Sequence, residues 1–334
     1  MKIADLSIKA ELIKYLKSNN LWAKKGLSQN FLVDKDALGK IVEAAELRTS
    51  DLVIEVGAGT GVLTRELVKR AGEVVAVELD QELAQLLNCY IVKLFESPSN
   101  SAIKSPPLAG SRQNAGQFSN EKFEIINADI LKLNLNKVIG SRKYKVVANI
   151  PYHITSKILE LFLSRNNKPE SMVLLVQKEV AERICAKPGD LSILAISVQL
   201  YGRSEIIDIV PKESFFPSPK VDSAILKINN IHNPFCHFDI RQRRDEKSHE
   251  ISRPSTSLRA RDDFTDEKEF FRLAHIGFAA RRKTLVNNLM AGYCLERNKV
   301  IDIIKKMDLE ETVRAQELSL KQWKKLAGAI KDVD

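Results

Sequence analysis

The stretch DLVIEVGAGTGVLTRELVKR, from Asp51 to Arg70, decides the fold. It begins as an apolar strand, turns through three closely spaced glycines and continues with the apolar periodicity of a helix. Glycines let the backbone turn sharply and approach a ligand without interference from a Cβ atom. A strand, a glycine turn and a helix in this order begin a βαβ unit, so a parallel sheet is expected.

The same rhythm continues along the chain. Strands are expected over residues 73–80, 123–130, 145–152 and 171–177, and helices over 34–47, 81–95 and from Ser156. The segments LSILAISVQLYG (191–202) and SAILKI (223–228) are expected to add late strands. The fold class is therefore α/β: a Rossmann-like domain, with a mostly parallel twisted sheet and helices on both faces, plus a small α-helical C-terminal domain.

Two segments interrupt this rhythm. Residues 97–120 contain 14 Ser, Pro, Gly or Asn among 24 residues and no acidic residue, which predicts a disordered insertion. Residues 239–269 contain 17 charged residues, 8 basic and 9 acidic, and this balance favours a solvated linker. The predicted domains are residues 1–230, a linker over 231–269 with the charged insertion, and a helical domain over 270–334.

The chain is basic, with 52 Lys and Arg against 43 Asp and Glu. A polyanionic partner, nucleic acid first, is one interpretation of this charge, and a protein that merely happens to be basic is the other. Four scattered cysteines without C-x-x-C favour reduced thiols and a cytoplasmic location. No apolar run approaches the roughly 20 residues of a membrane span. His232, Cys236 and His237 lack a fourth ligand, so no metal is expected.

The glycine turn and the next strand predict a cofactor site. Gly57 and Gly59 would approach the cofactor, and Glu78 ends the next strand, where a carboxylate can accept hydrogen bonds from both ribose hydroxyls of a nucleoside. Val62 stands where a dinucleotide motif has its third glycine, which favours S-adenosylmethionine over a dinucleotide. An ordinary strand-to-helix turn is the third possibility. Asp129, at a third strand end, could accept from the adenine amine.

The sequence Asn149-Ile150-Pro151-Tyr152 follows another strand and suggests methyl transfer to a base amine. The Asn149 amide oxygen and the Ile150 carbonyl could accept the two N–H groups and stabilise charge that develops on nitrogen. Pro151 would fix the turn, and Tyr152 would offer a flat face to an extruded base. Such a displacement depends on positioning and needs no prior deprotonation. The alternative is that Pro-Tyr merely ends the strand.

Together these motifs resemble the ribosomal RNA adenine N6,N6-dimethyltransferase family. The resemblance is carried by LSQNFLVD (27–34), VIEVGAGTGVLT (53–64), AVELD (76–80), NADIL (127–131), NIPYHITSKIL (149–159), VQKEVAERI (176–184), FFPSPKVDSAIL (215–226), GFAARRKTLVNNL (277–289) and VRAQELSLKQW (313–323). Two departures are Ser28, where the family usually has Gly, and the segment CAKPGD (185–190), which is shorter than usual and lacks Tyr-Gly.

The resemblance implies specific roles. It implies S-adenosylmethionine contacts at Asn30, Leu32, Gly57, Glu78, Asp129 and Asn149. It implies a second aromatic wall at Phe215, with the adjacent Phe216 as the other candidate. Arg281, Arg282 and Lys283, expected on a C-terminal helix, would grip rRNA phosphates, although a solvated polar face is the alternative. The protein is expected to be a monomer.

The family has two branches. One dimethylates two adjacent adenines in the 3′-terminal hairpin loop of small-subunit (16S) rRNA, coupled to subunit biogenesis, and residues 219–223 and 281–284 resemble it. The other modifies a large-subunit adenine and confers macrolide resistance, and Ile150 occurs readily there. The small-subunit branch is favoured. A ribosome-assembly or RNA-binding factor with little catalytic role and a DNA adenine methyltransferase are alternatives of other classes.

Overall fold

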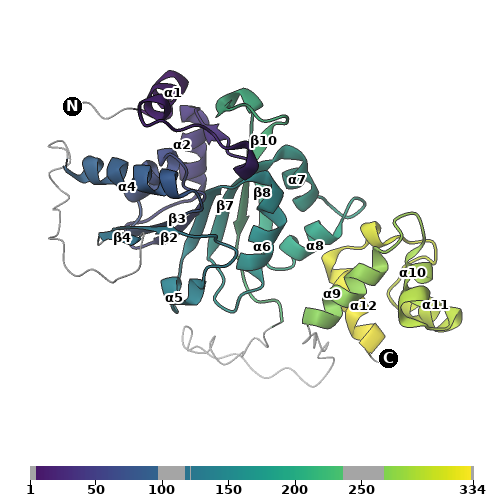
Figure 1. The fold of residues 1–334 in the computed structure, drawn as a ribbon. Coiled ribbons are helices and arrows are strands. Elements are labelled where there is room, and N and C mark those ends of the chain that lie inside the picture. Colours follow the sequence, from purple (N-terminus) through teal and green to yellow (C-terminus); the bar gives the residue numbers. More distant parts are fainter. Residues whose placement is uncertain (1–4, 97–116, 121, 236–266, 332–334) are drawn as a thin grey trace, which may run out of the picture. The chain divides into compact units, whose positions relative to one another are not determined.

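The computed structural model describes residues 5–96, 117–120, 122–235 and 267–331 (Figure 1). Its internal contacts divide the chain into two compact units. The first unit comprises residues 1–185 and 201–232, and the second comprises residues 186–200 and 233–334. Residues 186–200 thus belong with the C-terminal helices, a grouping that the sequence did not suggest.

The first unit is built on an eight-stranded sheet with the order β4-β5-β3-β2-β6-β7-β10-β8. Five central strands are parallel: β5 (Phe123–Asn127), β3 (Glu73–Glu78), β2 (Leu52–Val56), β6 (Lys145–Asn149) and β7 (Ser171–Gln177). Three strands are antiparallel: β4 (Gln117–Asn120) at one edge, and β10 (Ser223–Asn229) and β8 (Arg203–Val210) at the other. The strand order reverses between β2 and β6, which is where open α/β sheets bind ligands.

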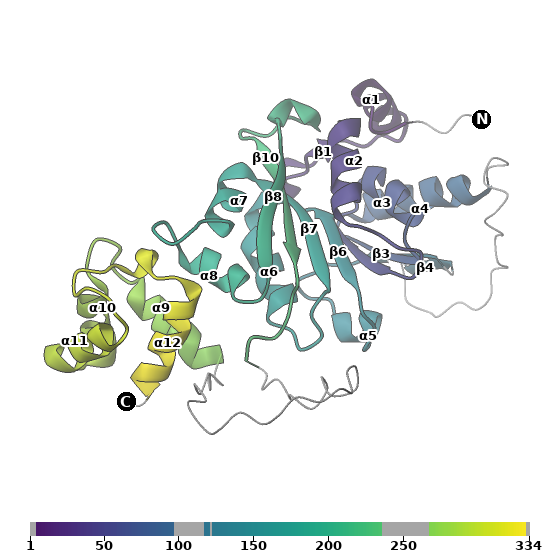
Figure 2. The same ribbon diagram turned by 180° about the vertical axis from the view of Figure 1, so that it is seen from behind.

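Helices cover both faces of this sheet (Figures 1 and 2). On one face α2 (Lys35–Ala44), α3 (Val62–Val68) and α4 (Gln81–Glu96) share a core with alternate strand residues such as Val53, Val147 and Val173. The opposite face is covered by α6 (Thr155–Leu163) and α7 (Lys178–Ile184). Two further α-helices, α1 (Lys9–Ser18) and the short α5 (Leu135–Ile139), complete the α-helices described in this unit. The predicted mostly parallel sheet with helices on both faces is confirmed.

A separate two-stranded sheet joins β1 (Phe31–Leu32) to β9 (Phe215–Phe216) in antiparallel pairing. The Val33 amide also donates to the Ser214 carbonyl at 2.8 Å. Asp34 accepts the Ser214 hydroxyl at 2.6 Å and caps the N-terminus of α2 by accepting from the amides of Asp36 and Ala37. The β1–β9 pairing therefore joins a segment near the N-terminus to residues 215–216, about two thirds of the way along the chain.

The second unit is helical. It comprises α8 (Ile193–Gln199), α9 (Glu267–Gly277), α10 (Leu285–Tyr293), α11 (Arg297–Lys306) and α12 (Leu320–Lys331). Trp323 is fully buried and stacks on Phe278 with ring centroids 5.5 Å apart. The Gly189 amide donates to the Gln316 carbonyl at 2.9 Å, which ties the short 185–190 segment to this unit. The predicted helical C-terminal part is confirmed.

Some local expectations were wrong. Residues 193–199 form α8 rather than a strand. The apolar run fits the periodicity of a helix as well as that of a buried strand, and the Ser192 hydroxyl caps the helix by accepting from the Ala195 amide. The following strand β8 was not predicted. Residues 117–120, assigned to the insertion, form β4, whose short polar sequence does not stand out from its surroundings. The remainder of that insertion and residues 236–266 lie outside the described residues.

The position of the basic triplet also differs from the expectation. Arg281, Arg282 and Lys283 lie between α9 and α10 rather than on a helix. Helix α9 ends at Gly277, whose carbonyl accepts from the side-chain amide of Asn288 at 2.6 Å. The Thr284 hydroxyl caps the start of α10. All three basic side chains are exposed there.

Candidate functional site

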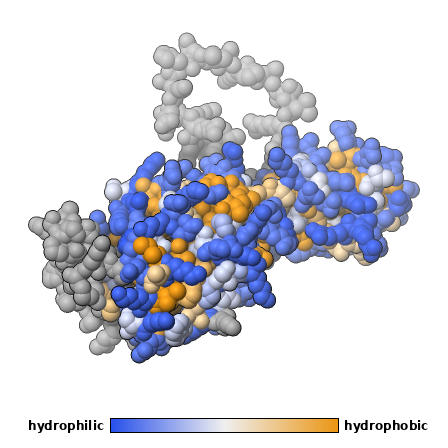
Figure 3. Space-filling model, turned by 90° about the horizontal axis from the view of Figure 1, so that it is seen from above, coloured by the Kyte–Doolittle hydropathy of each residue, from blue (hydrophilic) through white to orange (hydrophobic). Residues whose placement is uncertain are grey.

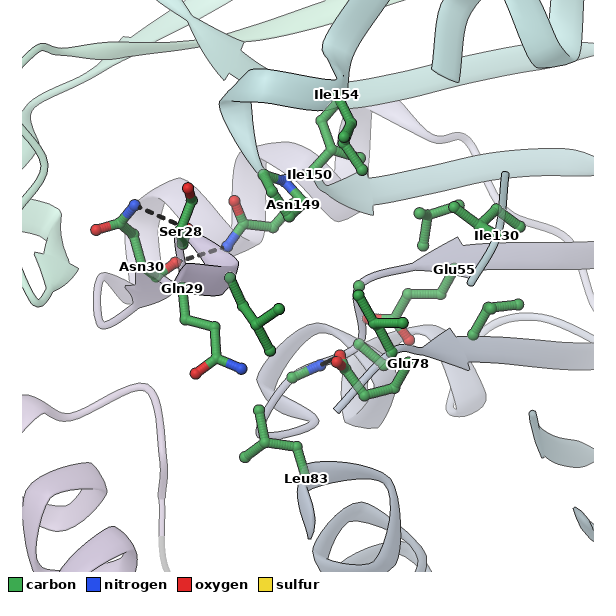
Figure 4. Close-up of a pocket in the computed structure, with 18 of the residues that line it drawn as sticks. Ser28, Gln29, Asn30, Glu55, Glu78, Leu83, Ile130, Asn149, Ile150 and Ile154 are labelled. Atoms are coloured by element: carbon green, nitrogen blue, oxygen red, sulfur yellow. Dashed lines mark hydrogen bonds between the residues drawn. The ribbon is translucent and has the colours of Figure 1, made fainter. Parts of the chain in front are cut away.

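A pocket of about 250 Å³ opens at the carboxyl ends of β2, β3 and β6, where the strand order reverses (Figure 4). We call the residues at the strand ends (55–60, 77–79, 128–131 and 149–154) the sheet wall, and Leu27–Leu32 the strap. The lining includes every predicted cofactor residue and most of the predicted substrate residues: Asn30, Leu32, Gly57, Gly59, Glu78, Asp129, Asn149, Ile150, Pro151 and Tyr152. The pocket thus brings together five motifs that are spread along the sequence from residue 27 to residue 159.

The glycine turn forms the centre of the sheet wall. Gly57 and Gly59 have φ values of 71° and 57°, a region that side chains with a Cβ atom rarely adopt. A Cβ atom on Gly57 would also stand 3.4 Å from the Asn149 carbonyl oxygen. The turn therefore needs glycine both for its backbone conformation and for the close approach of β2 to β6.

Glu78 ends β3 and faces the glycine turn. One carboxylate oxygen accepts from the Gly59 amide at 2.7 Å, and the other accepts from the Asp80 amide at 2.8 Å. Burial raises the pKa of Glu78, and the two amide hydrogen bonds act in the opposite direction. Each carboxylate oxygen can still accept a second hydrogen bond. Glu78 is therefore fixed by the backbone with acceptor capacity left over.

Glu55 is a second carboxyl group of the lining, and it was absent from the predicted site residues. Its side chain is 1% exposed, and its Oε2 atom has no hydrogen-bond partner; the neighbouring Thr64 hydroxyl is likewise unpaired. Burial raises the pKa of Glu55 to about 8, with a contribution from the Glu78 charge. The signal in the sequence was its place two residues before Gly57 in the glycine motif.

Asn149 stands at the end of β6 with a defined amide orientation. Its Nδ2 atom donates to the Asn30 carbonyl in the strap at 3.2 Å (Figure 4). Because a carbonyl can only accept, this contact assigns nitrogen to that side and leaves the amide oxygen Oδ1 as the free acceptor. Ile150, which follows Asn149, also lines the pocket and is 2% exposed as a whole residue.

Tyr152 begins the short 3-10 helix η3 (Tyr152–Ile154) immediately after Pro151. Its hydroxyl lies 2.6 Å from the hydroxyl of Ser223 on β10, and the Thr155 hydroxyl donates to its carbonyl at 3.0 Å. Burial raises the pKa of Tyr152 above its ordinary value of 10, so the hydroxyl stays protonated at neutral pH. The aromatic ring is thus held from both ends of the residue.

Phe215 does not reach this pocket, in contrast to its predicted role. Its side chain is fully buried in the core, opposite Leu32 in the β1–β9 pair. Successive residues of a strand face opposite sides, so Phe216 points the other way and is partly exposed, with the Lys9 ammonium 5.8 Å from its ring centroid. Neither phenylalanine lines the pocket. Phe215 would have to leave the core to stack on a base.

The strap is held at its end by the β1–β9 pairing and near its start by side chains. The Lys24 ammonium lies 2.9 Å from Asp80 and 2.6 Å from Glu82, and Gln29 donates to Asp80 at 3.0 Å. The side-chain oxygen Oε1 of Gln29 in turn accepts from the backbone amide of Lys24 at 2.8 Å. We call this group of four residues the clasp. Because Asp80 lies two residues beyond Glu78, the end of β3, the clasp fixes the strap beside Glu78 in the sheet wall.

Ser28 departs from the glycine that the family usually has in this position. It adopts a φ of 51° in the strap. A residue with a Cβ atom pays roughly 1–2 kcal/mol for this left-handed conformation, which glycine adopts freely.

These features together define a class of protein. A doubly wound sheet with a glycine turn at its switch point, a carboxylate on the adjacent strand and an amide across the crevice is a Rossmann-like methyltransferase fold. No described helix is long and apolar enough to cross a membrane, and the described residues contain no metal-binding cluster of His, Cys, Asp or Glu.

The chain belongs to the ribosomal RNA adenine dimethylase family, whose model matches residues 20–100 and 106–242. It is 37% identical over 321 residues to the ribosomal RNA small subunit methyltransferase A of Dehalococcoides mccartyi, covering 96% of this chain and 92% of the relative. It is 35% identical to the protein of the same name from Streptococcus uberis, covering 100% of this chain and 99% of the relative.

Solved structures agree on the fold. A dimethyladenosine transferase from Plasmodium falciparum superposes with a TM-score of 0.63 at 24% identity, covering 89% of this chain and 95% of that one. The 23S rRNA methyltransferase ErmE superposes with a TM-score of 0.59 at 24% identity, covering 90% and 100%. At this identity the likeness concerns the fold alone.

Proposed function

We propose that this protein transfers methyl groups from S-adenosylmethionine to N6 of two adjacent adenines in the 3′-terminal hairpin loop of small-subunit rRNA. The observation that carries the proposal is the meeting of the Gly57 turn and the Asn149 amide in one pocket at the switch point. The relatives at 35–37% identity, which are named small subunit methyltransferases, support this branch over the large-subunit alternative.

The residues present fit S-adenosylmethionine. The glycine turn lines the pocket, and Glu78 keeps acceptor capacity for ribose hydroxyls. Glu55 offers a buried oxygen without a partner to a cofactor that carries positive charge. Asn30, Leu32 and the strand-end Asp129 complete the lining. When bound, the cofactor would supply an electrophilic methyl group.

The substrate side of the pocket would act by positioning. The free Oδ1 of Asn149 and the Ile150 carbonyl would accept the two N–H groups of the adenine amine and orient its lone pair. Pro151 sets the turn, and the Tyr152 ring, anchored by Ser223, would stack on the flipped base. No side chain has to remove a proton before attack, because the amine is already neutral.

We also propose the division of labour between domains. Residues 1–230 would form the methyltransferase domain, and residues 270–334 would bind rRNA, with Arg281, Arg282 and Lys283 contacting phosphates. Their exposure on one turn supports this role. Phe215, or Phe216 beside it, would supply a second aromatic wall only after a rearrangement of β9. The protein would act as a cytoplasmic monomer on the immature small subunit during ribosome biogenesis.

The proposal is tested with tritiated S-adenosylmethionine and four substrates: undermethylated small subunits, naked small-subunit rRNA, large-subunit rRNA and duplex DNA. We expect label in the small-subunit RNA, recovered as N6,N6-dimethyladenine after nuclease digestion. Label in large-subunit rRNA alone would favour the other branch. Tight binding to small subunits without any label would indicate an assembly factor, and label in DNA would contradict the RNA substrate.

A further inference from the structure

Trp22 is the most exposed large hydrophobic side chain among the described residues. It is 57% exposed, compared with 54% for Leu79, 45% for Val221, 42% for Ile8 and 40% for Ile207. Figure 3 looks down on the side where α1 lies in Figure 1, and this surface is mostly hydrophilic with separate apolar patches. An indole is the largest side chain to leave in water, so the exposure of Trp22 calls for an explanation.

The backbone around Trp22 is well held. Leu21 before it is buried, and its amide donates to the Leu16 carbonyl at 2.9 Å. Ala23 after it packs against the core, and Lys24 belongs to the clasp. The indole is therefore presented from an ordered segment, and little conformational entropy would be lost when a partner covers it.

The surroundings of Trp22 are basic. The Lys17 ammonium lies 5.9 Å from the Trp22 ring centroid, within the range of a cation–π contact. Lys9, Lys14 and Lys17 are all exposed on α1, whose acidic residue is Glu11. An aromatic face beside ammonium groups suits an unpaired nucleotide, because the base stacks on the ring while the phosphate meets the cation. A neutral protein surface would gain little from the lysines.

Trp22 also lies close to the pocket along the chain. Two residues later, the Lys24 ammonium bonds Asp80, and Leu79 beside Asp80 lines the pocket and is half exposed. The strap begins at Leu27. A nucleotide stacked on Trp22 would therefore belong to the same RNA that delivers the target adenine, but it would not be the adenine itself.

We propose that Trp22 and Lys17 form a docking point for an unpaired RNA nucleotide outside the target adenine. This inference rests on the proposed function for the identity of the RNA, and goes beyond it by assigning an RNA contact to the N-terminal segment of the first unit. The contact secures the substrate strand at the strap side of the pocket while Asn149 and Tyr152 hold the reacting base.

The chain suits a fluorescence test because it contains two tryptophans, the exposed Trp22 and the fully buried Trp323. The difference in emission between the unmodified protein and Trp22→Phe isolates the Trp22 signal. The probe is a synthetic RNA hairpin whose loop carries two adjacent adenines. We expect the hairpin to quench Trp22 and to shield it from acrylamide, and we expect a fully paired RNA of equal length to do neither.

Variants then measure the contribution to binding. Trp22→Ala should weaken affinity for the hairpin by about tenfold, since stacking on an aromatic ring contributes roughly 1–3 kcal/mol per base. Trp22→Phe should retain most of the affinity, and Lys17→Met should lose a smaller, salt-dependent share. Ile207→Ala, which removes another exposed apolar side chain, is the matched control and should bind normally. S-adenosylmethionine affinity, measured by calorimetry, should be unchanged in all four variants.

Equal hairpin affinity of Trp22→Ala and Ile207→Ala would overturn the inference. Shielding of Trp22 by vesicles of anionic lipid, without shielding by RNA, would overturn it in favour of a membrane surface. The two proposals fail separately. If RNA shields Trp22 but no methyl is transferred, the proposed function is wrong and the docking point at Trp22 is supported. If methyl transfer is normal and Trp22→Ala binds RNA normally, this surface fails and the proposed function stands.

Discussion

The sheet wall and the strap enclose the same pocket, but they are held in different ways. In the sheet wall Glu78 and Asn149 end buried strands, and backbone groups fix their side chains, as the Gly59 and Asp80 amides fix Glu78. The strap is held by distant parts of the chain: Gln29 and the preceding Lys24 bond Asp80, and its last two residues pair with β9. The sheet wall should therefore carry the chemistry, and the strap should adjust how long a ligand stays.

The largest effect is expected for Asn149→Ala, the sheet-wall residue nearest the proposed chemistry. Loss of one preorganised group in a transition state typically lowers the rate by about 10²- to 10³-fold. Single-turnover methyl transfer to undermethylated small subunits measures this loss, with cofactor affinity measured separately. Asn136→Ala, on the exposed surface of α5, is the control. Methyl transfer at the unmodified rate would remove Asn149 from the chemistry.

The next effect concerns the buried Glu55 and the stability of the protein. Its pKa is about 8 in the folded chain against an ordinary value of 4.5, so the folded state holds the proton more tightly. The resulting stabilisation is complete below pH 4.5 and is lost as the pH rises through 8, with about 3 kcal/mol lost by pH 7.

Glu55→Gln should remove this pH dependence of the free energy of unfolding. Denaturant titrations at pH 5, 7 and 8.5 compare the variant with the unmodified protein and with Glu170→Gln, which changes an exposed carboxyl. The variant should gain stability relative to the unmodified protein between pH 5 and 8.5. If the free energy of unfolding changed with pH in the same way in all three proteins, Glu55 would be ionised in the folded state at neutral pH.

Glu78→Ala should weaken S-adenosylmethionine binding by roughly tenfold or more, because a hydrogen bond to a charged group contributes about 1.5–3 kcal/mol. Calorimetry on the folded variant measures this change. Glu73→Ala, at the opposite end of the same strand, is a close control. Unchanged affinity in the Glu78 variant would place the ribose contact elsewhere.

The smallest effect is expected in the strap. Lys24→Met should raise the dissociation constant for S-adenosylmethionine roughly two- to fivefold, mainly through faster release, because the Lys24 side chain is half exposed although its partner Asp80 is buried. Stopped-flow release rates at low and high salt test this, and Lys24→Arg should restore retention. Lys143→Met breaks another exposed pair, with Glu170, before the start of β6. A hundredfold loss of S-adenosylmethionine affinity in Lys24→Met would show that the strap contributes to cofactor binding as strongly as the sheet wall.

The sheet wall was largely predictable from the sequence, because its groups lie at the carboxyl ends of apolar strands. Gly57, Glu78 and Asn149 meet in the pocket for that reason. The clasp was not predictable, because its contacts join Lys24 to Asp80 across intervening elements and depend on rotamers. Family resemblance supplied Asn30 and Leu32, whereas the burial of Phe215 in the core became evident only in three dimensions.

Ambiguous periodicity explains the other differences. The apolar run in 193–199 fits a helix or a buried strand equally well, and the Ser192 cap decides between them only in three dimensions. Strand β8 lies at the edge of the sheet and carries Arg203, Glu205 and Asp208, so it lacked a continuous apolar signal.

The pairing of β1 with β9 has a consequence for the order in which the protein matures during synthesis. All parallel strands of the sheet wall precede residue 178, so that half of the pocket can assemble as soon as they have left the ribosome. The strap pairs with residues 215–216, which are made later, and closing this long loop costs entropy until its partner exists. A nascent chain stalled between these points should therefore display an open, half-built pocket, and cofactor retention should appear only after β9 emerges.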